Sequence, residues 1–421
     1  MAQAQAKEDV LGARIAPLAL PDGLRAPRET ALAWLGEIGL PGRRDEYWRY
    51  TDPARLNAVQ PAASIMEPEE QLFDGLDRVK LVFVDGVFDA AASDDPALAG
   101  VEISRLAEPA DIHWAAEFYG TLEALGQAPV RRPFGALNTA FATDGVLIRV
   151  TGAAAKPVAL IYRRSSEASD VILHHCVKVE AGAALTLLES GVAGARYNTA
   201  LEVDVADGGA FNHIRIQGRE DSRIANTHVF ARVGAESAFK SFTLTANGVM
   251  TRNEAVIELA GEGGIAHIAG AAVGNATFHH DDTVFITHGA PGCESRQVFK
   301  KVLRNGAVGV FQGKILVRQV AQKTDGYQIS QSLLLDEDSQ FLAKPELEIY
   351  ADDVKCSHGS TSGAIDEEGL FYLRSRGLPE SEARVLLVLA FLAEALQEIE
   401  DEGIAEMVRA RLEDWLLERK G

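Results

Sequence analysis

The sequence predicts a mainly β protein in which a β-helix core is flanked by helical N-terminal and C-terminal domains. Three observations support this fold class. From Val146 to about Tyr350, short segments rich in β-branched and aromatic residues alternate with Gly and Asp turns. Inside this stretch one turn motif recurs at a nearly constant period, and helical periodicity returns only from Asp366 onward. We therefore expect three domains, residues 1–144, 145–365 and 366–421.

The N-terminal domain is predicted to be mixed and rich in helices. Apolar residues in Ala31–Ile38, and again in residues 104–125 and 133–142, have the spacing of helices. Between them, Asp85-Gly86 separates two short apolar strands, Val79–Val84 and Val87-Phe88. Because Asp-Gly is typical of a tight hairpin turn, we expect one β-hairpin in this domain.

The central region contains an internal repeat. Gly182, Gly208, Gly234 and Gly261 occupy similar turn motifs and stand 26, 26 and 27 residues apart. A fixed period of this size is typical of solenoids, in which each repeat stacks on its neighbours. A β-sandwich with evenly spaced turns would also give short strands at regular intervals. The period and the turn motif recur together, which favours the β-helix.

The last 56 residues are predicted to form two amphipathic helices. Gly377-Leu-Pro-Glu380 is a typical helix start, with proline in the first turn and acidic residues near the positive end of the helix dipole. The helical spacing of apolar residues continues to Ile399, and we expect Gly403 to break it. Helices of this kind must bury their apolar faces, either on the solenoid or on a partner.

The composition narrows the possible classes of function. The chain has 421 residues, of which 47% are hydrophobic, and a formal net charge of −20. Such acidity disfavours nucleic acid and anionic membranes, because phosphate binding depends on Lys and Arg. No apolar run reaches the roughly 18 residues that a membrane span needs. With only Cys176, Cys293 and Cys356, a disulfide scaffold is not expected, and we predict a cytoplasmic protein.

The pair Cys356 and His358 is the strongest candidate for chemistry. It ends a strand-like run, Tyr350–Gly359, and in extended backbone residues i and i+2 lie on the same face. A thiol beside an imidazole suits zinc, copper or iron–sulfur chemistry. Two ligands do not hold a metal alone, so such a site needs groups from elsewhere. The alternative is a buried structural cysteine beside a hydrogen-bonded histidine.

A second cluster is His174-His175-Cys176. In a strand, His174 and Cys176 share one face and His175 takes the other. Because one of those faces is core in a solenoid, we expect Cys176 to serve in packing rather than as a ligand.

A third cluster, His279-His280-Asp281-Asp282, has a composition that suits a hard or borderline metal. Adjacent strand residues diverge, so we expect a polar turn there. The cluster nevertheless supports an alternative function, a stand-alone β-helix hydrolase or lyase that uses His279, His280 and Asp282.

Several catalytic motifs are missing from the sequence. It contains no G-x-x-x-x-G-K-[ST] phosphate loop, no G-x-S-x-G elbow and no H-E-x-x-H helix. We therefore expect no ATPase activity from the chain itself.

Five longer motifs run in order along the chain: Glu46–Thr51, Gly309–Val317, Gln322–Ser330, Lys344–Gly359 and Leu370–Gly377. Together they resemble the SufB/SufD family of iron–sulfur cluster assembly proteins, and within it the SufD branch. The resemblance spans nearly the whole length and is most specific over residues 295–377. One small departure is His358-Gly-Ser-Thr361, where the branch commonly has His-Gly-Ala-Thr.

The resemblance implies a right-handed parallel β-helix flanked by helical domains, and a scaffold subunit rather than an enzyme. It implies that the chain pairs with SufB along the β-helices and binds the ATPase SufC through residues 366–421. A nascent iron–sulfur cluster, bound transiently and shared with SufB, would form at their interface. His358 is the residue implied as a metal ligand there, with Cys356 as its neighbour. A further possibility is a homodimeric scaffold that uses the same interface twice.

Overall fold

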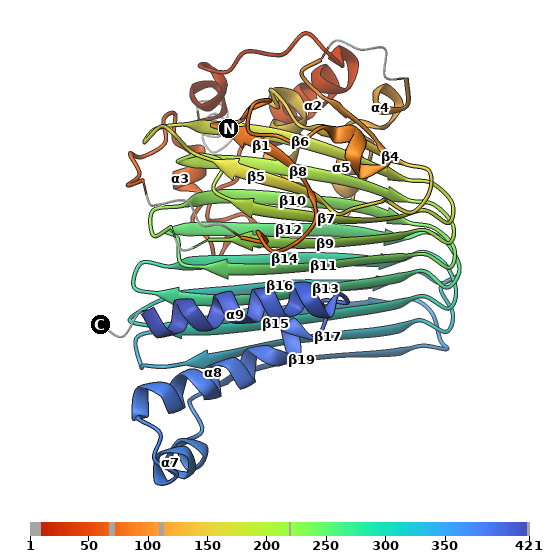
Figure 1. Ribbon diagram of the computed structural model, residues 1–421. Helices are drawn as coiled ribbons and strands as arrows, with labels where there is room; N and C mark the ends of the chain where they lie inside the picture. Colours follow the sequence, from red (N-terminus) through yellow and green to blue (C-terminus); the bar gives the residue numbers. More distant parts are fainter. Residues whose placement is uncertain (1–9, 67–71, 109–112, 219, 419–421) are drawn as a thin grey trace.

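Two long β-sheets form the body of the molecule and are wound into a parallel β-solenoid (Figure 1). This computed structural model describes residues 10–66, 72–108, 113–218 and 220–418. Successive strands alternate between the two sheets, so each turn of the solenoid adds one strand to each sheet. The parallel pairing rules out the antiparallel β-sandwich and confirms the predicted β-helix.

The strands stack in sequence order along both sheets. The nine-stranded sheet contains, in spatial order, β18 (Gln340–Ile349), β16 (Val308–Val317), β14 (His279–His288), β12 (Met250–Leu259), β10 (Ile224–Val233), β8 (Arg196–Val205), β6 (Asp170–Val179), β4 (Val146–Val150) and β3 (Glu102–Arg105). The ten-stranded sheet contains β19 (Lys355–Gly363), β17 (Asp325–Leu334), β15 (Glu294–Arg304), β13 (Ile265–Asn275), β11 (Ala238–Ala246), β9 (Ala210–Gln217), β7 (Ala184–Gly191), β5 (Val158–Arg163), β1 (Val79–Val84) and β2 (Val87–Phe88). Only the β1–β2 and β3–β4 pairs are antiparallel among these strands.

The stacked turns repeat at the predicted spacing, but their register differs in one respect. A left-handed backbone, with φ between 50° and 69°, recurs at Gly182, Gly208, Glu236, Gly263 and Gly292. The N–H at this position donates to the next turn, as in the 2.8 Å bond from Gly208 N to Ala235 O. Glycine is favoured because it has no Cβ to clash. Gly234 and Gly261 lie two residues before this position, so they belong to the repeat without supplying its left-handed residue.

The hydrophobic core lies between the two sheets. It is lined by apolar side chains from nearly every turn, among them Leu160, Leu187, Val203, Phe211, Phe239, Ile257, Phe299 and Phe311. Phe211 and Phe239 are stacked with ring centroids 5.5 Å apart, and Phe299 and Phe311 lie 4.9 Å apart. Stacking of the same residue type from turn to turn buries a continuous core, which no single repeat could do.

The N-terminal helices cover the first turns of the nine-stranded sheet (Figure 1). They comprise α2 (Arg25–Ile38), η1 (Glu46–Trp48), α3 (Ala54–Asn57), η2 (Pro96–Ala99), α4 (His113–Phe118), α5 (Thr121–Gly126) and α6 (Pro133–Phe141). Helices α5 and α6 pack against β6, β8 and β10. The predicted hairpin is confirmed as β1–β2, and β1 also joins the solenoid through β5. The helix predicted for residues 104–125 is wrong at its start, because Glu102–Arg105 pairs with β4, and residues 109–112 lie outside the described residues.

Three helices follow the last strand: α7 (Glu367–Ser375), α8 (Glu380–Leu396) and α9 (Glu402–Glu418). Helix α8 packs on β13 and β15, on the outer face of the ten-stranded sheet, and α7 extends beyond β19 (Figure 1). The predicted helical pair is confirmed, although Gly403 lies in the first turn of α9 and the break falls at residues 397–401. None of the helices that the structure describes combines the length and apolarity needed to cross a membrane.

Candidate functional site

Strand β19 holds Cys356 and His358 at the edge of the ten-stranded sheet. Its register with β17 places Cys356 opposite Gly326 and His358 opposite Gln328. Both side chains therefore lie on one face of β19, as predicted from their spacing. Cys356 is half-buried and packs beside the apolar cluster of Ile315 and its neighbours, whereas His358 is exposed to solvent.

The surroundings of Cys356 are set by the strand beside it. Gly326 leaves room for the thiol, because a Cβ at that position would lie 3.2 Å from the Cys356 sulfur. Burial raises the pKa of the Cys356 thiol, and the Asp325 carboxylate adds to that effect, while the Gly326 backbone N–H opposes it. The thiol is therefore protonated at neutral pH, and a metal ion would have to displace that proton.

The site on β19 is incomplete within this chain. Across the residues that the structure describes, one group of three His, Cys, Asp or Glu ligand atoms is close enough to hold a metal, and it excludes Cys356 and His358. Two protein ligands fall short of the four that structural zinc sites and iron–sulfur clusters generally use. Any metal held here therefore needs ligands from another molecule.

The open end of the solenoid surrounds this pair. β18 and β19 are the terminal strands of their sheets, so one backbone edge of each has no strand partner in the described chain. Every residue of β18 is at least partly exposed, in contrast to the mostly buried β16. At the opposite end the sheets finish in the antiparallel pairs β1–β2 and β3–β4, beside the N-terminal helices. Unpaired strand edges readily accept another chain.

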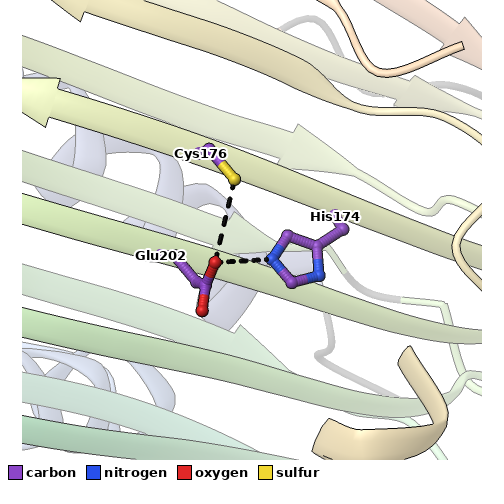
Figure 2. A group of neighbouring side chains, drawn as sticks. All are labelled: His174, Cys176 and Glu202. Carbon is purple, nitrogen blue, oxygen red and sulfur yellow. Dashed lines mark hydrogen bonds and ion pairs between the residues drawn. The ribbon is translucent and has the colours of Figure 1, made fainter. Parts of the chain in front are cut away.

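The group of three ligand atoms consists of His174, Cys176 and Glu202 (Figure 2). His174 and Cys176 lie on one face of β6, as predicted, and Glu202 stands on β8 directly beside Cys176. The Glu202 Oε2 atom is 3.2 Å from His174 Nε2 and 3.8 Å from the Cys176 sulfur. All three residues are fully buried. Burial and the neighbouring Glu202 carboxylate hold the pKa of Cys176 well above its usual value.

Glu202 was not among the residues singled out from the sequence. The signal that could have found it is the repeat itself, since Glu202 follows Cys176 by 26 residues, one full period. In a solenoid, residues one period apart lie side by side on neighbouring strands. The period thus predicts spatial neighbours as well as fold class.

The His279–Asp282 cluster differs from its prediction. The residues belong to strand β14 and not to a polar turn. His280 and Asp282 point to the same side, where Lys301 Nζ lies 2.7 Å from His280 Nδ1 and 2.6 Å from Asp282. Both residues are buried, and burial together with Lys301 lowers the pKa of His280 well below its usual value. A buried, internally bonded group of this kind offers no substrate access, which argues against the hydrolase or lyase alternative.

The solenoid turns that carry these residues match a known protein family. The family model "SUF system FeS cluster assembly, SufBD core domain" matches residues 162–391, which include β6–β19 and both Cys356 and His358. The match covers more than half of the chain, and the chain belongs to the SufBD family of the SUF iron–sulfur cluster assembly system.

Individual relatives place the chain near SufD proteins. It is 31% identical over 411 residues to the iron–sulfur cluster assembly protein SufD of Escherichia coli (strain K12), a match that covers 92% of each chain. It is 27% identical over 399 residues to the SufBD family protein slr0076 of Synechocystis, covering 88% of this chain and 86% of that one. SufD of Bacillus subtilis is 26% identical over 266 residues, or 61% of this chain and 60% of the relative. The chain therefore has a role in iron–sulfur cluster assembly.

Proposed function

We propose that this chain is a non-catalytic scaffold subunit of a SufB–SufC–SufD complex, in which nascent iron–sulfur clusters form where β19 meets a SufB-like chain. The observation that carries the proposal is the incomplete ligand pair on an open strand edge. Thiolate is the usual protein ligand of iron–sulfur clusters, and imidazole replaces it in some of them. Cys356 and His358 supply one of each, and the partner would supply the rest.

The open edge itself supports pairing with a chain of similar architecture. A partner solenoid that presents its own terminal strands could continue the parallel hydrogen-bonding of β18 and β19. Pairing of this kind would cover the exposed residues of β18 and enclose His358. Burial between two chains would also exclude water from a newly formed cluster. A second copy of the same chain could use this edge too, and the experiment below separates that case.

The C-terminal helices support a second contact, with a SufC-like ATPase. The neighbouring residues Phe371 and Tyr372 of α7 are 74% and 56% exposed, and Leu386 of α8 is 42% exposed. Large exposed apolar side chains gathered on one element are typical of interaction surfaces. Since the sequence has no phosphate-binding loop, ATP hydrolysis would belong to the partner. We assign the N-terminal part to residues 1–144, the solenoid to 145–365 and SufC binding to 366–421.

The same proposal places the complex in the cytoplasm. Cys176, Cys293 and Cys356 are all free thiols in the structure. Free thiols, one of them half-exposed, fit a reducing compartment, in which transient clusters are also protected from oxidation.

The experiment is reconstitution of the chain with SufB-like and SufC-like proteins, followed by anaerobic addition of iron and sulfide. We expect the three proteins to co-purify, and we expect His358→Ala to abolish most of the cluster absorbance of the complex. Cys356→Ala, made separately, shows whether the thiol is a second ligand. Ser357→Ala is the matched control, because Ser357 is exposed between the two residues but lies on the other face of β19.

Two results would contradict the proposal. The ligand role is wrong if His358→Ala and Ser357→Ala assemble the same amount of cluster as the unaltered chain. The partner assignment is wrong if native mass measurement shows that the chain forms only homodimers in the presence of both partner proteins.

A further inference from the structure

The buried group of His174, Cys176 and Glu202 contains an arrangement that hydrogen bonding within the protein does not satisfy. His174 Nε2 is buried without a hydrogen-bond partner, although Glu202 Oε2 is only 3.2 Å away. An imidazole nitrogen facing a carboxylate oxygen at this distance needs a positive charge between them, because two lone pairs repel. The candidates are a proton or a metal ion.

The tautomer of His174 is fixed by Asn138. The Asn138 side-chain N–H groups donate to the carbonyls of Leu173 and Asn198, both at 2.9 Å. Its Oδ1 atom therefore faces His174 Nδ1, at 2.9 Å, and can only accept. Nδ1 carries the proton and Nε2 presents its lone pair to Glu202 and Cys176. An imidazole held in this way by a second residue is the usual arrangement of a metal-binding histidine.

Glu202 is held with equal definition. Its Oε2 accepts the Gly120 backbone N–H at 2.7 Å, and its Oε1 accepts the Glu123 backbone N–H at 2.8 Å. These bonds aim the carboxylate from β8 toward the histidine and the thiol on β6 (Figure 2). The three side chains thus converge from two neighbouring strands, while Tyr119 covers His174 with its ring centroid 4.3 Å away.

The distances between the ligand atoms suit a tetrahedral metal ion. With usual Zn–N, Zn–O and Zn–S bond lengths, tetrahedral angles give an N···O separation of about 3.3 Å and an S···O separation of about 3.6 Å. The observed values are 3.2 Å and 3.8 Å. All three ligand atoms lie within 4.8 Å of one another. Only a small contraction would be needed to bring them around one ion.

We propose that His174, Cys176 and Glu202 bind a divalent transition-metal ion of borderline softness, Zn²⁺ or Fe²⁺, at a site separate from the pair on β19. One thiolate, one imidazole and one carboxylate are a ligand set that favours such ions over Mg²⁺ or Ca²⁺. The ion would join β6 and β8 to the segment that carries Gly120 and Glu123. It would therefore fasten the N-terminal helices to the solenoid.

A cavity beside the site offers an entry route. It has a volume of about 720 Å³, and its lining includes Trp34, Tyr119, Gly120, Glu123 and Thr139. Gly120 and Glu123 also donate the N–H groups that hold Glu202, so the segment that positions the carboxylate forms part of the cavity wall. A small movement of this segment would expose the ligands to an ion in solution.

The test uses the full-length variant Cys293→Ser/Cys356→Ser, in which Cys176 is the one remaining cysteine. After treatment with a chelator, Zn²⁺ is added anaerobically and the bound metal is measured. We expect one tightly bound equivalent per chain, with an X-ray absorption spectrum showing one sulfur at about 2.3 Å and nitrogen or oxygen ligands at about 2.0–2.1 Å. Further substitution of Cys176→Ser should weaken binding by more than about 100-fold, since even second-shell partners are worth 10- to 100-fold.

The serine at position 176 retains a hydroxyl donor for Glu202, and far-ultraviolet circular dichroism checks that the variant is folded. No stoichiometric Zn²⁺ in the single-cysteine variant, or a shell without sulfur, would overturn the proposal and leave a proton as the bridging charge. Equal binding with and without Cys176 would overturn it too. Loss of the tight equivalent from the otherwise unaltered chain in His358→Ala alone would place the metal on β19, and the scaffold proposal would stand without this second site.

Discussion

The chain has two pairs of histidine and cysteine with one residue between them, and the solenoid gives them opposite surroundings. His174 and Cys176 lie on β6, fully buried beneath the N-terminal helices. Cys356 and His358 lie on β19, where the thiol is half-buried and the imidazole is exposed. The local pattern is the same, so the place of each strand in the stack decides which pair is closed and which is open.

The difference teaches where a third ligand comes from in a solenoid. β6 has β8 as its next neighbour in the sheet, and β8 supplies Glu202 beside Cys176. β19 is the last strand of its sheet, so no further turn of the described chain can supply an equivalent residue. A pair on a terminal turn is left incomplete by geometry alone, and another chain must then provide the remaining groups.

The largest expected effect is on folding stability. Glu202→Ala would remove the acceptor of two backbone N–H groups and leave His174 and Cys176 buried without a partner. We expect a loss of about 3–5 kcal/mol in the free energy of unfolding, as for a broken buried pair. His358→Ala, on the exposed edge, should change it by no more than about 0.5 kcal/mol. Urea titration of both variants in the presence of a chelator measures the difference.

The chelator matters because any bound metal would add to the stability of the unaltered chain. Glu202→Gln serves as an intermediate variant, since it keeps an oxygen acceptor and the side-chain shape. Similar losses in Glu202→Ala and His358→Ala would show that the two pairs do not differ in the way the burial implies.

The sequence carried most of the fold and about half of this comparison. The repeat of 26 and 27 residues was enough to predict a solenoid, because each turn must stack on the next to bury a core. The edge position of Cys356 could be inferred from where the repeat ends. Glu202 was missed because a lone acidic residue in a strand has no local signal, and its meaning depends on the register between β6 and β8. The strand at His279–Asp282 was missed because buried Lys301 compensates charges that, by sequence alone, favour a solvated turn.

Acid should affect the enclosed part of the solenoid next most strongly. His288 is buried, and burial lowers its pKa to about 4. In the unfolded chain its pKa is about 6.5, so between these values the unfolded state binds a proton that the folded state does not. The contribution of a neutral His288 is therefore complete above about pH 6.5 and falls as the pH drops toward 4, by roughly 3 kcal/mol in all.

The measurement compares urea unfolding of the unaltered chain and His288→Gln at several pH values between 7 and 4. Carboxylates titrate in both proteins, so only the difference between the two profiles reports on His288. We expect the variant to lose less stability as the pH falls. Parallel profiles would show that the imidazole is protonated in the folded protein and that the interior near β14 is more hydrated than its burial indicates.

The smallest effect should appear at Gly326, which makes room for the thiol on the open edge. An alanine Cβ there would lie 3.2 Å from the Cys356 sulfur, closer than an ordinary contact, and 3.6 Å from Ile315. Since Ile315 is buried and β19 is the last strand of its sheet, the sulfur would move toward solvent. We expect Gly326→Ala to cost no more than about 1 kcal/mol and to speed alkylation of Cys356. Gly359→Ala is the matched control on β19, because its Cβ would meet nothing within 4 Å. Equal alkylation rates in the two variants would mean that Gly326 does not set the exposure of the thiol, and that Cys356 is held instead by its own strand.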